Sequence, residues 1–120
     1  MATVKIETTA LDELIVDSES AYPYETGGLL LGSFLSERAI ITRYLSLPNL
    51  RREEGVKDRI LISARDVLAA ERLAGEQGLD VLGFYHTHPD GLPWPSAYDL
   101  EHALPAWFYL IAAIDRGRFG

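Results

Sequence analysis

The sequence has no cysteine and few basic residues, and both shortages narrow what the protein can be. Without cysteine there are no disulfides, no thiolate nucleophile and none of the zinc motifs that include a cysteine. A transition metal would therefore be held by histidine and carboxylate side chains. Lys and Arg number 11 against 18 Asp and Glu, which gives a formal net charge of -7. Such a chain lacks the basic surface that binds a nucleic-acid backbone, whereas a neutral or basic protein substrate is compatible with it.

Long apolar runs are also missing. No stretch approaches the roughly 18 apolar residues that cross a bilayer. The first residues, MATVKIETTALDE, include acidic side chains and lack the apolar core of a signal peptide. We therefore expect a cytoplasmic protein that does not bind membranes. The 120 residues suffice for one domain with a core, and the hydrophobic content of 48% is ordinary for a globular chain.

Strand-like and helix-like segments are mixed along the chain. Runs of apolar or β-branched residues predict strands at 4–6, 28–32, 39–47, 59–62, 79–85 and 107–114. The run at 79–85 is almost entirely apolar, as in a strand covered on both faces, and the last run predicts a central strand. Residues 48–58 read as a charged surface loop. We therefore predict an α/β (α+β) fold, with one mixed sheet and helices packed against it.

Three helices are predicted from their start and stop signals. Thr9 to Asp12 and Ser63 to Asp66 have the spacing of capping boxes, in which a side-chain oxygen and a carboxylate satisfy free N–H groups. Pro23 is expected to end the first of these helices and Gly78 the second. A third helix is predicted to begin near Ser96, after a loop rich in Pro and Gly.

Two histidines follow the apolar strand at 79–85. Residues two apart in a strand point to the same face, so His86 and His88 should lie side by side at its carboxyl end. Two neutral imidazoles suit a borderline-soft ion such as zinc. Asp99, in the first turn of the next helix, would add an oxygen ligand. Three protein ligands leave the fourth tetrahedral position to water, as in catalytic zinc sites.

A hydrolase also needs a carboxylate that takes a proton from the metal-activated water and passes it to the leaving amine. Glu25 is the candidate for this role. It precedes Thr26-Gly27-Gly28 at the mouth of a predicted strand, where glycines permit close approach of the backbone to a ligand.

Each of these features also has a purely structural explanation. A pair of histidines on a strand can be incidental, Ser96 and Asp99 fit a helix capping box, and Glu25 can be a turn carboxylate. Gly27-Gly28 can form a simple β-bulge. His102, three residues beyond Asp99, is expected to be a surface or core-edge residue rather than a ligand. The joint occurrence of these residues is what favours a metal site.

Taken together, the residues resemble the motif of the JAMM/MPN-plus metalloproteases. The motif consists of Glu25, a long interval, the run from His86 to Pro89, and then Ser96 and Asp99, with seven residues between His88 and Ser96. The resemblance extends along nearly the whole chain, through the segments ETGGLLLG, LDVLGFYHTHP and PSAYD. It implies that residues 1–120 are one JAMM/MPN-type metallopeptidase domain with the cytidine-deaminase-like fold of that family.

The same resemblance implies a role for each site residue. His86, His88 and Asp99 would ligate one Zn²⁺ ion, whose bound water is the nucleophile. Glu25 would orient and deprotonate that water. Ser96 would donate a hydrogen bond to the oxyanion of the tetrahedral intermediate.

The short form is similar to the prokaryotic branch of the family. That branch cleaves peptide or isopeptide bonds after the Gly-Gly end of ubiquitin-like or sulfur-carrier proteins of β-grasp fold, which implies such a protein as the partner. The resemblance also suggests that the extended tail adds to the enzyme as a strand. The insertion with which eukaryotic deubiquitinases grip a distal ubiquitin is missing, so we do not expect that type of linkage selectivity.

The C-terminal residues 115–120 follow directly on the predicted central strand, where family members usually continue into further strands. We therefore expect an abbreviated C-terminus. An unpaired strand edge there would favour pairing with a second copy of the chain as a homodimer.

Three other functions are alternatives to a hydrolase of ubiquitin-like proteins. A catalytically silent MPN-type binding scaffold would lack one or more of the metal-motif residues, and all of them are present. A zinc peptidase acting on another substrate, such as a cell-wall peptide, fits the same residues. A zinc nucleobase deaminase is disfavoured, because that class uses a pair of cysteines.

Overall fold

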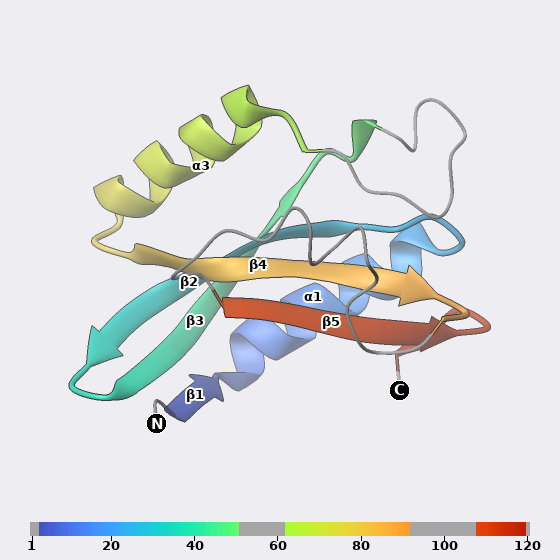
Figure 1. Cartoon of the computed structure of the whole chain (residues 1–120), viewed down its shortest axis with the longest axis horizontal. Coiled ribbons are helices and arrows are strands. Elements are labelled where there is room, and N and C mark those ends of the chain that lie inside the picture. Colours follow the sequence, from blue (N-terminus) through green and yellow to red (C-terminus); the bar gives the residue numbers. More distant parts are fainter. Residues whose placement is uncertain (1–2, 51–61, 92–107, 120) are drawn as a thin grey trace.

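The computed structural model describes residues 3–50, 62–91 and 108–119, which build a sheet with a helix on each face (Figure 1). In chain order the elements are β1 (Thr3–Ile6), α1 (Thr8–Ala21), β2 (Gly27–Leu35), β3 (Arg38–Leu47), α3 (Ala64–Glu76), β4 (Asp80–Pro89), β5 (Phe108–Asp115) and β6 (Arg118–Phe119). The described strands form a six-stranded sheet in the order β1-β3-β2-β4-β5-β6. Strand β2 is antiparallel to β3 and β4, whereas β1 is parallel to β3 and β5 is parallel to β4. The predicted mixed fold is confirmed.

The two faces of the sheet carry separate apolar clusters. Alternate residues of a strand point to opposite faces, so Leu30 of β2 packs toward α1 whereas Leu29 and Leu31 pack toward α3. The α1 cluster consists of Ala10, Leu14, Leu30, Ala39, Ile41, Tyr44, Leu82, Tyr85, Ala112 and Ile114. The α3 cluster consists of Leu29, Leu31, Leu47, Ala70 and Ala74.

Strand β4 confirms the prediction that residues 79–85 form a strand covered on both faces. Its Leu82 and Tyr85 are buried in the α1 cluster, and Val81 and Phe84 pack against the α3 cluster. Because β4 lies between β2 and β5, it is hydrogen-bonded on both sides. The strands predicted at 4–6, 28–32 and 39–47 are also confirmed, as β1, β2 and β3.

One of the two capping boxes is confirmed and the other is wrong. Ser63 caps α3, and its hydroxyl accepts a hydrogen bond from the Asp66 N–H at 3.1 Å. Helix α1, by contrast, begins at Thr8 after Glu7, which makes no side-chain capping bond. The strand before it sets this start, because the Glu7 N–H donates to the Ile41 carbonyl of β3 at 2.9 Å. Helix α1 then ends at Ala21, just before Pro23, as predicted.

The last predicted strand is confirmed as β5, but its central position is wrong. It is second from the edge of the described sheet, beside the two-residue strand β6. Ala112 and Ile114 are buried, whereas Tyr109 and Leu110 are 37% and 39% exposed. After β5 the chain turns back, and Phe119 of β6 pairs with Ile114 of β5. The edge of β5 was expected to be unpaired, but β6 covers its carboxyl end. The apolar composition predicted a buried strand, although Tyr109 and Leu110 are partly exposed.

Some predictions fall outside the described residues. These are most of the loop at 48–58, the strand at 59–62 except Ile62, and the helix near Ser96. Ile62 itself packs against the α3 cluster. In the part of the chain that the structure describes, neither helix has the length and apolar character needed to cross a membrane.

Replacing Gly32 with alanine tests how tightly β2 and β3 pack. A Cβ at Gly32 would lie 1.8 Å from the Ile40 carbonyl oxygen, so the backbone would have to move. We expect Gly32→Ala to lower the free energy of unfolding by roughly 2–3 kcal/mol. Gly75 of α3 is the control, because a Cβ there meets nothing within 4 Å, and Gly75→Ala should stabilise by about 0.5–1 kcal/mol. Urea unfolding measures both, and equal stabilities of the two variants would contradict this packing.

Candidate metal centre

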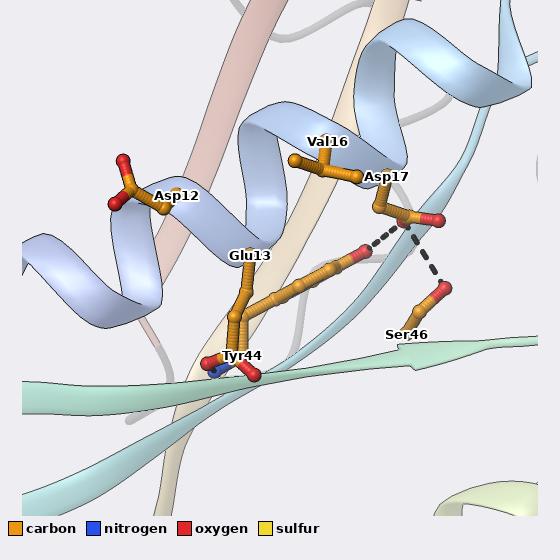
Figure 2. Close-up of a pocket in the computed structure, with 6 residues that line it drawn as sticks. All are labelled: Asp12, Glu13, Val16, Asp17, Tyr44 and Ser46. Atoms are coloured by element: carbon orange, nitrogen blue, oxygen red, sulfur yellow. Dashed lines mark hydrogen bonds between the residues drawn. The ribbon is translucent and has the colours of Figure 1, made fainter.

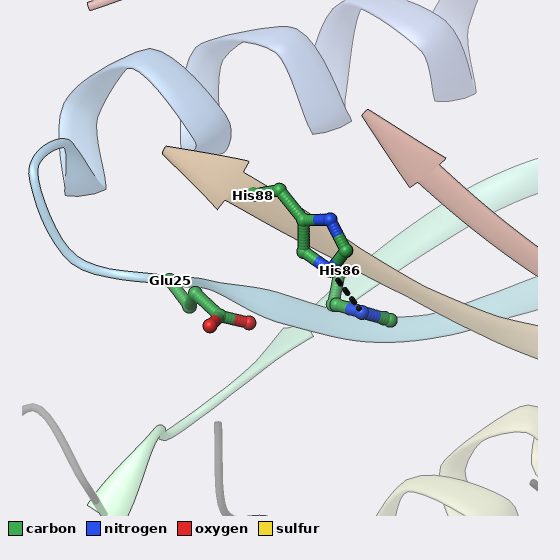
Figure 3. Close-up of side chains that lie close together, drawn as sticks. All are labelled: Glu25, His86 and His88. Carbon is green, nitrogen blue, oxygen red and sulfur yellow. Dashed lines mark hydrogen bonds between the residues drawn. The ribbon is translucent and has the colours of Figure 1, made fainter. Parts of the chain in front are cut away.

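Both histidines lie near the carboxyl end of β4, on the face opposite α1. Tyr85 packs in the α1 cluster, and Thr87 shares its face, so the alternating residues His86 and His88 point the other way. Their Nε2 atoms are 3.2 Å apart and their ring centroids 5.0 Å apart (Figure 3). His86 is buried and His88 half-buried. The predicted side-by-side arrangement of the two imidazoles is confirmed.

The spacing of the imidazoles fits a shared metal ion. Two nitrogens that each lie about 2.0–2.1 Å from a tetrahedral zinc are roughly 3.3 Å apart. The Nε2 atoms of His86 and His88 are separated by 3.2 Å, close to this value. Phe84 lies beside His86, with ring centroids 5.7 Å apart, and gives that imidazole an apolar flank. The pair can therefore ligate one ion without a large rearrangement of β4.

Glu25 completes a group of three candidate ligands with His86 and His88. One oxygen of its carboxylate and one nitrogen of each imidazole all lie within 4.8 Å of one another (Figure 3). Glu25 is only 6% exposed, although it carries a charged group. The pairing of β2 with β4 places Glu25 here, because Gly27 lies opposite His86. A carboxylate and two imidazoles are a donor set that zinc accepts.

Hydrogen bonds hold the main chain around Glu25. Its carbonyl oxygen accepts a bond from Asn49 Nδ2 at 2.8 Å. The N–H of Thr26 donates to the Thr87 hydroxyl, and the N–H of Thr87 donates to the Thr26 carbonyl, both at 3.0 Å. Thr87 is the residue between the two histidines. These contacts connect the segment that carries Glu25 directly to the strand that carries the imidazoles.

Asp17 of α1 accepts hydrogen bonds from three hydroxyl groups, one of them that of Thr26, next to Glu25. Its Oδ2 accepts hydrogen bonds from Thr26 at 3.1 Å, from Tyr44 at 2.6 Å and from Ser46 at 3.1 Å. Asp17, Tyr44 and Ser46 help to line an open groove of about 460 Å³ between α1 and β3 (Figure 2). Burial and then the Asp17 charge raise the pKa of Tyr44 well above its usual value. The Tyr44 phenol therefore stays protonated and donates to the carboxylate.

Tyr85 packs edge-to-face on Tyr44, with ring centroids 5.5 Å apart. The Tyr85 side chain is fully buried, and its hydroxyl shares a hydrogen bond with that of Ser18. Burial raises the pKa of Tyr85 to about 12. The face of β4 opposite the histidines is thus neutral at ordinary pH.

Asp90 fixes the chain where it leaves β4. Its carboxylate accepts hydrogen bonds from the Tyr22 hydroxyl and, at 2.8 Å, from the Arg116 N–H. The bond from Tyr22 lowers the pKa of Asp90 and raises that of Tyr22. These contacts hold the end of β4 against the end of α1 and the turn after β5.

The structure therefore brings together three of the residues predicted for the site, Glu25, His86 and His88. Ser96, Asp99 and His102 lie outside the described residues, so their roles stay predictions. The alternative that Gly27-Gly28 forms a β-bulge is wrong. Both glycines pair in regular register with β3 and β4, and the register shifts occur on either side of Leu31.

Sequence reasoning missed the residues that hold Glu25 in place. Thr87 could have been suspected, because it lies between the two histidines on the opposite face of the same strand. Asn49 and Asp17 carried no such signal. They meet Glu25 and Thr26 only through the pairing of β2 with its neighbours and the packing of α1 on the sheet.

Comparison with known proteins yields one family. A family model described as prokaryotic homologues of the JAB domain matches residues 7–119. The chain is 34% identical over 104 residues to the Lys-63-specific deubiquitinase BRCC36 of Camponotus floridanus, covering 82% of this chain and 40% of that protein. It is 32% identical over 94 residues to a desampylase of Haloferax volcanii, covering 78% of this chain and 65% of that protein. The chain thus spans less than two thirds of the length of either relative.

Solved structures share the fold. A solution structure of a Desulfitobacterium hafniense protein superimposes with a TM-score of 0.82 at 23% identity, covering 98% of this chain and 88% of that one. A JAB1/MPN domain protein of Archaeoglobus fulgidus superimposes with a TM-score of 0.59 at 24% identity, covering 91% of this chain and 77% of that one. The predicted JAMM/MPN-like fold is confirmed.

We expect the free energy of unfolding to fall as the pH rises from about 10 to about 12. The pKa of Tyr85 is about 12 in the folded chain, against an ordinary value of 10.0, because burial disfavours the phenolate. This stabilisation is complete below pH 10 and is lost as the pH rises through 12, on the order of 2–3 kcal/mol in all. Urea unfolding across this range measures it. Between these pH values the Tyr85→Phe variant should lose less free energy of unfolding than the wild type. Equal losses would contradict the raised pKa of Tyr85.

Proposed function

Because the chain belongs to the family of prokaryotic homologues of the JAB domain, we propose that it is a zinc-dependent peptidase or isopeptidase. Its substrate would be a ubiquitin-like or sulfur-carrier protein, cleaved after a C-terminal Gly-Gly. The observation that carries the proposal is the meeting of Glu25, His86 and His88 at the end of β4. Relatives whose names describe a deubiquitinase and a desampylase support this class of substrate.

His86, His88 and Asp99 would hold the ion. When bound, Zn²⁺ would supply a Lewis acid that lowers the pKa of a coordinated water to about 7. The Nε2 spacing of 3.2 Å supports the two imidazoles as ligands. Asp99 is proposed as the third ligand only because it occupies that position in the sequence motif. In this arrangement Glu25 is kept for proton transfer rather than for ligation.

Glu25 would act as the general base and then as the general acid. Its carboxylate takes the proton from the attacking water as the oxygen bonds to the substrate carbonyl carbon. It returns that proton to the amine nitrogen when the C–N bond breaks. Ser96 would donate a hydrogen bond to the oxyanion that forms between these steps. The burial of Glu25 supports such a role, because few water molecules compete for its oxygens.

The Gly-Gly specificity, a homodimer formed through the β5 edge and the cytoplasmic location stay predictions, as does the assignment of residues 1–120 to one domain. The family match over residues 7–119 supports the last of these. The presence of Glu25, His86 and His88 in one cluster disfavours the catalytically silent scaffold.

Replacing the proposed base separates catalysis from metal binding. We expect Glu25→Gln to retain stoichiometric zinc but to lower hydrolysis by about 10²–10⁴-fold, because the amide cannot accept the proton. The assay follows by mass the products of a ubiquitin-like carrier extended beyond its Gly-Gly. Glu13→Gln is the matched control, since Glu13 pairs with Arg43 on the α1 side, and it should cleave at the wild-type rate. Normal turnover by Glu25→Gln would reject the assignment, and loss of zinc would make Glu25 a ligand.

Replacing one histidine tests the ligands themselves. We expect His88→Ala to lose stoichiometric zinc, because only two of the three proposed protein ligands remain. Elemental analysis of the purified protein measures this. His102→Ala is the control, since His102 is predicted not to be a ligand, and it should keep its zinc. Full zinc retention by His88→Ala would reject the ligand set.

A further inference from the structure

We propose that Asn49 and Thr87 are positioning residues that clamp the peptide group between Glu25 and Thr26, and thereby aim the Glu25 carboxylate at the two imidazoles. The inference rests on the proposed function, in which Glu25 is the base. Neither residue belongs to the motif residues assigned to metal binding or proton transfer. Both bind the main chain beside Glu25.

The clamp grips a single peptide group at both of its polar atoms. The carbonyl oxygen of Glu25 accepts a bond from Asn49 Nδ2 at 2.8 Å, and the N–H of Thr26 donates to Thr87 Oγ1 at 3.0 Å. These two atoms belong to the same planar unit. Holding both of them fixes the orientation of that plane, and with it the ψ angle of Glu25. The direction in which the Glu25 side chain leaves the backbone depends on this angle.

Side chains are needed here because the regular ladder ends. Strand β2 begins at Gly27, so Glu25 lies before the sheet. The bond from the Thr87 N–H to the Thr26 carbonyl extends the pairing of β2 and β4 by one residue. The next N–H, that of Thr26, then binds the Thr87 hydroxyl. Asn49 reaches the carbonyl of Glu25 from the segment just after β3, which ends at Leu47.

Burial makes these contacts costly to lose. Thr87 is 0% and Asn49 9% exposed, so little water can replace a missing partner. A buried N–H or C=O left without a partner costs about 1–3 kcal/mol. The Thr26 hydroxyl also donates a hydrogen bond to Asp17, which connects this segment to α1. If one of these bonds were lost, the peptide group between Glu25 and Thr26 would move to form new hydrogen bonds. The Glu25 carboxylate would move with it.

Thr87 is placed so that it affects the base and not the ligands. It points to the α1 face, away from His86 and His88, so a change at its hydroxyl touches neither imidazole. A displacement of a reacting group by about 1 Å can lower a rate by roughly 10²-fold. Losing the hydroxyl should therefore lower kcat while zinc stays bound.

The test compares Thr87→Val, which replaces the hydroxyl with a methyl group of similar size, with Thr87→Ser, which keeps the hydroxyl and loses the methyl group. We expect Thr87→Val to retain zinc and its KM within about two-fold, and to lower kcat by about 10–100-fold. Thr87→Ser should recover kcat to within about three-fold. Hydrogen exchange of the Thr26 amide gives a readout independent of activity. It should quicken by about ten-fold or more in Thr87→Val and return toward the wild-type rate in Thr87→Ser.

Thr42→Val is the matched control on β3. The Thr42 hydroxyl is also buried, but within the described residues it has no hydrogen-bond partner, so its loss should leave kcat and Thr26 exchange unchanged. If Thr87→Val does not fold, Asn49→Ala removes the other end of the clamp and should show the same loss of kcat with zinc retained. In a Glu25→Gln background Thr87→Val should lower the residual rate no further, because both changes disable the same group.

The outcomes separate the clamp from the proposed function. An active wild type with unchanged kcat in Thr87→Val would overturn the clamp, as would a further loss in the Glu25→Gln background. An inactive wild type would overturn the proposed function and, with it, the role of Glu25 as base. Thr26 exchange would then still decide whether the Thr87 hydroxyl holds the peptide, and unchanged exchange in Thr87→Val would overturn that contact as well.

Discussion

The antiparallel pairing of β2 with β4 is the constraint on which the site depends. It places Gly27 opposite His86 and so brings Glu25, far away in the sequence, within 4.8 Å of the imidazoles of His86 and His88. One register satisfies this geometry. A slip by one residue would turn the histidines to the opposite face of the sheet. The apolar residues of both strands oppose such a slip, because their alternation matches the α1 cluster on one face and the α3 cluster on the other.

The two faces of β4 therefore carry different kinds of side chain. The face toward α3 presents His86 and His88, and the face toward α1 carries Tyr85 and Thr87. On the α1 side the polar groups are satisfied within the protein: Thr87 binds the main chain of Thr26, and Tyr85 shares a hydrogen bond with a serine of α1. Polar atoms buried in this way stabilise one arrangement only when every partner is present. The α1 side can thus orient the site through hydrogen bonds of Thr87 and Tyr85, whose side chains carry no charge at ordinary pH.

Residues close together in the sequence were the ones that could be predicted. The alternation in β4 predicted that His86 and His88 share a face, and the capping of α3 by Ser63 followed from local spacing. Long-range packing decided the rest. Helix α1 begins one residue before the predicted Thr9 cap because Glu7 remains bonded to β3. Strand β5 looked central because it is apolar, but composition does not specify which strand lies beside it. The contacts of Asn49 join segments that no short pattern links.

The sheet positions the residues of the candidate metal centre, but it does not determine the surface around them. Glu25 and the histidine pair lie on β2 and β4 or at their ends, where the sheet fixes their separation. A substrate would instead be selected by the surface around them, and the relatives compared extend well beyond the part matched here. A shared metal centre requires only that a few atoms keep their spacing, whereas a shared substrate requires agreement over a whole interface. The spacing of a few atoms on the sheet therefore sets the chemistry of the site, whereas the choice of a substrate would depend on contacts outside the motif.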